Sequence, residues 1–170
     1  GRTVGLVGFG AVPRLLAPIL SAMGATVIYT GRRRYEDVSC PYVDKDELLA
    51  RSDIVSLHVP LAAETRDWLD AASIARMKTG AVVINVARGG LVDEQALVAA
   101  LERRQIGAAG LDVFAQEPAA AGHPLFSRSD VVLSPHVGWL TRETFERSMV
   151  VAVENCRRLM EGGSLLHQVV

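Results

Sequence analysis

The sequence has little cysteine, no excess of either charge and no long apolar run. Its two cysteines, Cys40 and Cys156, lie far apart and form no metal-ligand pattern, so reduced thiols in a cytoplasmic protein are the simplest interpretation. The 18 Lys and Arg against 19 Asp and Glu give a net charge of −1, which offers no reason to expect nucleic acid or an acidic membrane as a partner. No apolar run reaches the roughly 20 residues that span a bilayer, so we expect no membrane segment.

Length and composition are those of one globular domain. The chain has 170 residues, of which 49% are hydrophobic and 22% charged, and this suffices to bury a sizeable core. A strand is predicted to begin already at Thr3, and no basic segment followed by an apolar one resembles a signal peptide. We therefore expect the chain to be a segment of a longer protein.

Short apolar segments alternate with segments of helical periodicity. Strands are predicted at residues 3–7, 25–30, 54–57, 81–86, 108–113 and 131–133, and helices at 13–23, 44–51, 93–104 and 141–161. The strands lack a clean alternation of apolar and polar residues, which is typical of a parallel sheet that helices cover on both faces. The pattern predicts a doubly wound α/β fold of the Rossmann type, with residues 1–170 forming a single dinucleotide-binding domain.

A glycine-rich turn follows the first predicted strand. Gly8 allows a tight turn, and Gly10 lets the backbone approach a pyrophosphate closely. The helix after them offers free N–H groups and its positive dipole end to the phosphates. The third glycine of this pattern is missing, because Pro13 stands there, although proline is tolerated in a first helical turn. The turn predicts a dinucleotide site, with a plain turn between strand and helix as the alternative.

The end of the second predicted strand bears on the choice of cofactor. An acid there would hydrogen-bond the adenosine ribose, but this strand ends at Thr30, and Arg32, Arg33 and Arg34 follow. A carboxylate would repel a 2′-phosphate, whereas an arginine binds it through forked, charge-assisted hydrogen bonds. We therefore predict that NADP is preferred and NAD is possible, with Arg32 as the first contact and Arg33 as the second. The alternative is a solvated basic turn.

Three charged residues each follow a predicted strand. Arg88, Glu117 and His136 would share one edge of a parallel sheet, where ligands bind. Reduction of a keto group needs a proton donor, and histidine titrates near neutral pH. A carboxylate can orient the imidazole and favour its protonated form, and an arginine can bind a substrate carboxylate and polarise the carbonyl. Taken singly, Arg88 could merely decorate a turn, and His136 could be a hydrogen-bonded loop residue.

Four motifs make the chain resemble the D-isomer-specific 2-hydroxyacid dehydrogenases. They are residues 57–61 (LHVPL) with 64–66 (ETR), 83–94 (VINVARGGLVDE), 110–118 (GLDVFAQEP) and 134–141 (SPHVGWLT). They occur in the order found in that family and cover nearly the whole chain, and the resemblance is to the cofactor domain of the family. The resemblance implies that Arg88 binds and activates the substrate, that Glu117 tunes the histidine, and that His136 is the acid and base.

The resemblance also implies contacts with the cofactor. The residues carried over are Ala11, Val12, Val59, Pro60, Thr65, Val86, Ala87, Arg88, Asp112, His136 and Gly138. Among them, Asp112 would meet the nicotinamide carboxamide and Gly138 would line the same pocket. The chain departs from the family pattern at Pro13, which replaces a glycine, and at Thr30, which replaces the usual acid. The second departure resembles NADP-preferring glyoxylate or hydroxypyruvate reductases.

Members of this family carry a second, smaller substrate domain, and the chain has no residues to build it. We therefore expect the 170 residues to bind cofactor but to turn over a 2-keto or 2-hydroxy acid poorly. The alternatives are a corepressor-type module that senses dinucleotides without turnover, and a dinucleotide-binding domain with no catalytic role. The resemblance implies a homodimer when the protein is intact. The apolar stripe of the last predicted helix would suit that, although ordinary core packing explains it as well.

Overall fold

The computed structural model describes residues 1–168 and divides the chain into two compact units. The first unit is Gly1–Pro135, and the second begins at His136. All the buried hydrophobic residues of the described chain lie at or before Leu125, so the core belongs to the first unit. No helix within residues 1–168 is long and apolar enough to cross a membrane.

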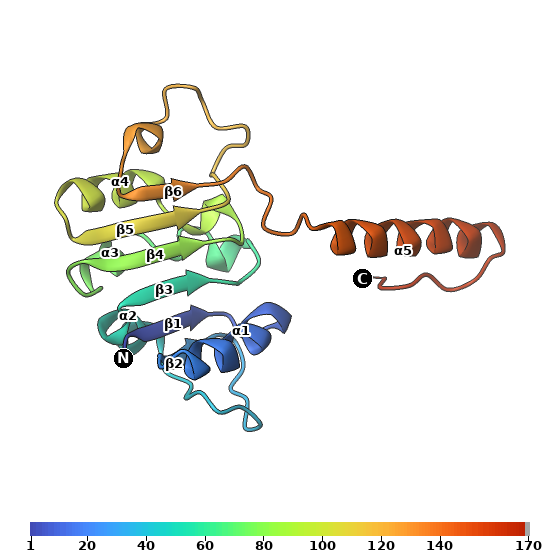
Figure 1. Ribbon diagram of the computed structural model, residues 1–170, viewed down its shortest axis with the longest axis horizontal. Helices are drawn as coiled ribbons and strands as arrows, with labels where there is room; N and C mark the ends of the chain where they lie inside the picture. Colours follow the sequence, from blue (N-terminus) through green and yellow to red (C-terminus); the bar gives the residue numbers. More distant parts are fainter. Residues whose placement is uncertain (169–170) are drawn as a thin grey trace. The chain divides into compact units, whose positions relative to one another are not determined.

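The first unit is built on a six-stranded parallel sheet, which Figure 1 shows with its strands side by side. The strands are β1 (Thr3–Val7), β2 (Thr26–Thr30), β3 (Ile54–Leu57), β4 (Ala81–Asn85), β5 (Ile106–Leu111) and β6 (Val131–Leu133). Their order across the sheet is β2-β1-β3-β4-β5-β6. The order therefore reverses at β1, and the crevice between β1 and β3 at the carboxyl ends of the strands is the expected ligand site. This confirms the predicted α/β fold class.

Helices connect the strands and a long helix follows the sheet. They are α1 (Ala11–Ala22), α2 (Lys45–Arg51), α3 (Ala71–Ala75), α4 (Glu94–Glu102) and α5 (Arg142–Met160), with the short 3₁₀ helices η1 (Ala63–Thr65), η2 (Gly89–Leu91) and η3 (Pro124–Ser127). The N-cap residues of α2, α3, α4 and α5 are Asp44, Asp70, Asp93 and Thr141. The side chain of each accepts a hydrogen bond from the backbone N–H of the residue three positions later.

The two faces of the sheet are covered to different extents within the first unit. Alternate residues of β1 and β2 enter two core clusters, because successive strand side chains point to opposite faces. One cluster contains side chains of α2, α3 and α4, whereas the other contains Ala17 of α1 packed with Leu6 and Tyr29. On the face that α1 shares, Val132 of β6 is 77% exposed. Helices of this unit thus cover one face broadly and the other only beside β1 and β2.

Two elements begin two residues earlier than predicted. Helix α1 begins at Ala11 rather than at 13, which puts Pro13 third in the helix, where its missing N–H still has no intrahelical acceptor. Strand β5 runs over Ile106–Leu111 rather than 108–113. Gly107 is part of this strand. A Cβ at this position would lie 2.6 Å from the carbonyl oxygen of Gly80, so a residue with a side chain would not fit there. The absence of a side chain thus permits a close backbone approach inside the sheet.

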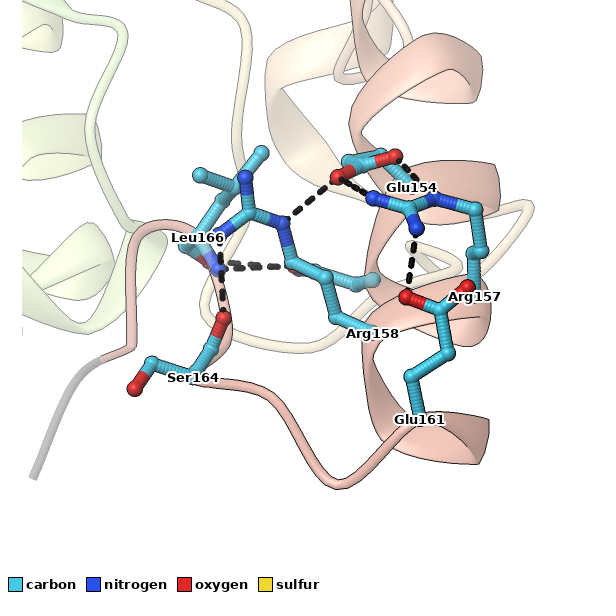
Figure 2. Close-up of polar contacts among 7 residues, drawn as sticks. Glu154, Arg157, Arg158, Glu161, Ser164 and Leu166 are labelled. Carbon is cyan, nitrogen blue, oxygen red and sulfur yellow. Dashed lines mark hydrogen bonds and ion pairs between the residues drawn. The ribbon is translucent and has the colours of Figure 1, made fainter.

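The second unit consists largely of α5 and the segment that follows it. Glu154 accepts hydrogen bonds from Arg157 and Arg158 at 2.6–3.0 Å, and these side chains are drawn together in Figure 2. The guanidinium groups of Arg157 and Arg158 lower the pKa of the Glu154 carboxyl to about 2. Beyond the helix, Leu166 donates its N–H to Asn155 at 2.7 Å and accepts from the Asn155 amide at 3.2 Å. The chain after α5 therefore folds back along its own helix.

Candidate functional site

A cleft of about 770 Å³ opens where the order of the strands reverses. It is formed by the segments that follow β1, β2 and β3, together with the loop that contains η1. Eight of the predicted cofactor residues line it: Gly8, Gly10, Thr30, Arg32, Arg33, Val59, Pro60 and Thr65. The position and size of the cleft suit an extended ligand such as a dinucleotide.

The glycines of the first turn test whether a dinucleotide fits. Gly8 has a φ of +91°, and a Cβ there would lie 2.8 Å from the Cγ1 of Val59, so the turn itself requires glycine. At Gly10 a Cβ would meet no heavy atom of the described chain within 4 Å. The packing of the protein therefore does not explain Gly10, whereas the close approach of a pyrophosphate does.

The N-terminus of α1 directly follows Gly10 of the cleft, although the predicted residues Ala11 and Val12 do not themselves line the cleft. Ala11 and Val12 are exposed, and their N–H groups precede the first intrahelical hydrogen bond, which runs from Arg14 to the carbonyl of Gly10 at 3.2 Å. No side chain caps this helix end. Two backbone donors and the positive end of the helix dipole are thus available to an anion, and the residues present fit a dinucleotide.

Contacts with α1 hold the loop after β2. The N–H of Tyr35 donates to the hydroxyl of Tyr29 at 2.7 Å. The guanidinium of Arg14 lies over the ring of Tyr35, 4.1 Å from its centroid, and 3.7 Å from the carboxylate of Asp37. These contacts hold the part of the loop that follows the three arginines, at Tyr35 and Asp37.

Arg32 and Arg33 line the cleft, whereas Arg34 does not. All three are exposed, and within residues 1–168 no hydrogen bond or ion pair occupies their side chains. Thr30 is buried, and its carbonyl accepts the N–H of Gly8 at 2.8 Å, which ties the ends of β1 and β2 together. The rim of the cleft therefore carries the guanidinium groups of Arg32 and Arg33, which are free to bind a ligand. The residue at the end of β2 is Thr30 and not an acid.

Several residues that line the cleft were not predicted. They are Val7, Phe9, Gly31, Tyr35, His58, Ala62, Glu64 and Trp68. The Nε2 of His58 lies 2.9 Å from the hydroxyl of Ser56, and burial lowers the pKa of the His58 imidazole. His58 therefore presents a neutral ring to the cleft near pH 7. The sequence signal that could have identified His58 as a cleft residue is its position in the LHVPL motif, next to the predicted cofactor residues Val59 and Pro60.

Thr65 organises the loop on the opposite side of the cleft. Its hydroxyl accepts the N–H of Ala62 at 2.8 Å and donates to the carbonyl of Pro60 at 2.7 Å. Trp68 is held from behind by Lys45, whose ammonium lies 4.5 Å from the ring centroid and donates to the Trp68 carbonyl at 2.5 Å. Both contacts give this wall of the cleft a defined shape before a ligand binds.

Arg88 lies further along the same edge of the sheet, after β4, and is exposed. The buried side chain of Asn85 holds the turn, because its amide donates to the Arg88 carbonyl at 2.9 Å and its oxygen accepts from Ala87 at 3.1 Å. Val86, Ala87 and Arg88 do not line the cleft. Asn85 was missed in the sequence, although a polar residue inside an apolar strand is a usable signal.

The structure brings the Arg88 turn against the loop that carries Glu117. A Cβ at Gly89 would lie 1.8 Å from the carbonyl carbon of Phe114, so only glycine permits this approach. The N–H of Phe114 donates to the Oε1 of Glu117 at 3.0 Å. Two of the three predicted catalytic residues are thus carried by loops that touch one another.

Asp112 follows β5 and is buried, with a relative exposure of 5%. Its Oδ1 accepts the hydroxyl of Ser134 at 2.5 Å, and its N–H donates to the Asn85 carbonyl at 3.0 Å. Asp112 does not line the cleft. Its contact with a nicotinamide carboxamide stays a prediction.

His136 and Gly138 belong to the second unit. His136 has a φ of +56°, which a non-glycine residue rarely adopts. Its approach to Arg88 and Glu117 stays a prediction, because the two units are described separately. Across residues 1–168 no group of three or more His, Cys, Asp or Glu side chains is arranged to hold a metal ion.

Comparisons with known proteins agree on one family. Residues 1–138 match the family model described as "D-isomer specific 2-hydroxyacid dehydrogenase, NAD binding domain". The chain is 43% identical over 167 residues to the glyoxylate/hydroxypyruvate reductase B of Salmonella newport, covering 95% of this chain and 51% of that protein. The chain thus spans about half the length of the curated relatives it matches.

Solved structures give the same result. The TT0316 protein of Thermus thermophilus is similar at a TM-score of 0.95 and 42% identity, covering 100% of this chain and 54% of that one. A glyoxylate reductase from Paecilomyes thermophila is similar at a TM-score of 0.91 and 40% identity, covering 99% and 52%. With its sheet order, glycine turn and family match, the chain belongs to the D-isomer-specific 2-hydroxyacid dehydrogenases, as their NAD-binding domain.

Proposed function

We propose that the chain is the cofactor domain of an oxidoreductase that transfers a hydride between NADPH or NADH and a 2-keto or 2-hydroxy acid. The cleft at the reversal of the strand order carries this proposal, because its turn, helix end and arginines suit the phosphates of a dinucleotide. The names of the relatives, glyoxylate and hydroxypyruvate reductases, support a small 2-keto acid as the substrate. A nicotinamide cofactor bound here would supply the hydride.

In this proposal each of the three predicted catalytic residues has one task. Arg88 binds the substrate carboxylate and polarises the keto group. His136 donates a proton to the forming alkoxide and withdraws it in the reverse direction. Glu117 orients the imidazole and favours its protonated form. The exposure of Arg88 on a turn fixed by Asn85 supports its role as a substrate contact.

We further propose that the cofactor is NADP in preference to NAD. Arg32 and Arg33 are uncommitted at the rim of the cleft, and a 2′-phosphate offers them oxygen acceptors that NAD lacks. Each charge-assisted hydrogen bond contributes roughly 1.5–3 kcal/mol, or about 10- to 100-fold in affinity.

Calorimetric titration of the chain with NADPH and NADH tests this preference. We expect tighter binding of NADPH, and Arg32→Ala should weaken NADPH binding about 10-fold while leaving NADH binding nearly unchanged. Arg34→Ala is the matched control, because Arg34 belongs to the same run but lies outside the cleft lining. Equal or tighter binding of NADH would overturn the NADP preference.

Turnover tests the proposed reaction itself. In the longer protein that we expect, His136→Ala should abolish reduction of glyoxylate or hydroxypyruvate and leave NADPH binding intact. The 170 residues alone should turn over poorly, since half of the substrate cleft would be missing. Full activity of the isolated chain would contradict that expectation, and turnover by His136→Ala would contradict the assignment of the acid.

Two further parts of the proposal concern the intact protein. We infer that it is a cytoplasmic homodimer, which rests on the resemblance to the family and on the reduced state of Cys40 and Cys156. Light scattering of the full-length protein tests the dimer. The Salmonella newport and Paecilomyes thermophila relatives are named as reductases, and neither name supports the corepressor-type alternative.

A further inference from the structure

A polar cluster outside the cleft joins the start of α4 to the loop between β5 and η3. Glu94 is the first residue of α4, and His123 immediately precedes η3. The Nε2 of His123 lies 3.2 Å from the Oε2 of Glu94. This distance is a direct hydrogen bond, and the two side chains are only 16% and 19% exposed.

The hydrogen bonds of His123 assign its tautomer. Its Nδ1 accepts the N–H of Leu125 at 3.4 Å, so the ring proton resides on Nε2 and is donated to Glu94. A second ring proton on Nδ1 would oppose the Leu125 N–H. In this tautomer the ring uses both nitrogens, and the carboxylate of Glu94 also lies at the positive end of the α4 dipole.

Glu94 extends this arrangement to the loop that carries Glu117. Its second oxygen, Oε1, accepts the N–H of Ala115 at 2.7 Å. The preceding N–H, that of Phe114, donates to the Oε1 of Glu117 at 3.0 Å. Two adjacent backbone donors thus hold two carboxylates, one from α4 and one from the loop itself.

Aromatic packing reinforces the same contact. The ring of Phe114 lies edge-on to His123, with centroids 5.3 Å apart, and edge-on to Phe126 at 5.8 Å. On the other side of Phe114, its backbone packs against Gly89, next to Arg88. The loop is therefore clamped between the Arg88 turn and the pair formed by His123 and Glu94.

We propose that His123 and Glu94 are positioning residues that hold the loop of residues 114–117 so that Glu117 keeps a fixed orientation. The inference rests on the proposed function, because it takes Glu117 to act on the reaction. Neither residue lines the cleft, and the pair reaches the loop through the N–H of Ala115 and the ring of Phe114.

Amide hydrogen exchange of the 170-residue chain tests the clamp without any turnover. In His123→Ala we expect the Ala115 amide to exchange about 10-fold faster, while the amide of Val83 in β4 keeps its rate. His123→Gln, which retains an N–H donor toward Glu94, should restore much of the protection. Arg128→Gln is the matched control, because it breaks the ion pair with Asp130 just beyond η3 and leaves Glu94 intact.

Two exchange results would overturn the clamp. One is an unchanged rate at Ala115 in His123→Ala, and the other is a parallel rise at Ala115 and Val83, which would mean a loss of overall stability alone. Should His123→Ala fail to fold, Glu94→Gln replaces it, since its amide N–H₂ group would oppose the His123 N–H while its carbonyl still faces Ala115.

Kinetics of the longer protein test the consequence for Glu117. We expect kcat to fall about 10-fold in His123→Ala and to recover in His123→Gln, while KM for NADPH stays unchanged because the cleft is untouched. Unchanged kcat in a variant with fast Ala115 exchange would refute the positioning role. Absence of turnover in the unsubstituted protein would instead refute the proposed function, and the exchange result would still stand on its own.

Discussion

Asp53 ties together three parts of the edge of the sheet at its amino end. Its Oδ2 accepts the N–H of Thr3 at 2.7 Å, its Oδ1 accepts from Lys78 at 3.1 Å, and Arg2 lies 3.8 Å away. The hydrogen bond from Thr3, followed by that from Lys78, lowers the pKa of the Asp53 carboxyl below its ordinary value of 3.8. The native state therefore holds this proton less tightly than the unfolded chain does.

The pH dependence of stability follows from that direction. The contribution of Asp53 is fully present above a pH of about 3.8 and is lost as the pH falls through the lower native pKa, because the unfolded chain binds the proton first. We expect Asp53→Asn to be less stable than the parent chain at pH 7, and this difference to shrink below pH 4. Urea unfolding at several pH values measures it.

Glu36→Gln is the control for this prediction, since Glu36 is exposed and makes no hydrogen bond or ion pair within the described residues. Its unfolding free energy should follow that of the parent chain at every pH. A difference between Asp53→Asn and the parent that stayed constant with pH would contradict the assignment.

The residues that we propose to carry chemistry were selected from the sequence because they follow predicted strands, whereas the residues that hold their turns were not. Arg88 and Glu117 stand after apolar segments, and the parallel fold places such positions on one edge. Asn85 offered a local signal as a polar residue inside an apolar strand, whereas the contact of His123 with Glu94 joins residues 29 positions apart and has no local signal. Gly89 needs to be glycine only because Phe114, 25 residues later, packs on it.

At the scale of elements, a single side chain caps the N-terminus of each of the helices α2, α3, α4 and α5. In α4 the Oδ1 of Asp93 accepts the N–H of Ala96 at 3.0 Å. We expect Asp93→Ala to lower the free energy of unfolding by about 1 kcal/mol, since the Ala96 donor loses its acceptor. Asp93→Asn keeps an acceptor oxygen and should cost only a fraction of this. Denaturant unfolding measures both, and equal losses in the two variants would show that charge rather than capping is responsible.

Elements with strong local signals were predicted, whereas a short helix and a strand boundary that depends on distant backbone were missed. Helix α2 and the apolar strands β1, β3 and β6 were found from the sequence, because their signals are local. Helix α3 was missed since its five residues are too few to show a period of 3.6. The start of β5 was misplaced because a glycine such as Gly107 is typical of a strand end. Its close packing on the backbone of Gly80 is visible only in the structure.

At the scale of the whole molecule, burial separates the two units. The buried hydrophobic residues extend from Val4 to Leu125, and α5 contains no buried residue. The second unit instead relies on the Thr141 cap, on exposed ion pairs such as that between Arg142 and Glu146, and on the return of the chain to Asn155. Exposed ion pairs stabilise little and are screened by salt, whereas burial of apolar surface dominates folding.

The two units should therefore differ in local stability. We expect the amides of α5 to exchange at least about 100-fold faster than that of Leu6 in β1, because α5 contains no buried residue. Helix α4 is the matched control, since it is also helical but buries Leu97 and Leu101, and its amides should exchange as slowly as those of the sheet. Raising the salt concentration should speed exchange in α5 further and leave α4 unchanged. Protection of α5 equal to that of Leu6 at low protein concentration would mean that the helix unfolds only with the core, and would refute the separation of the units.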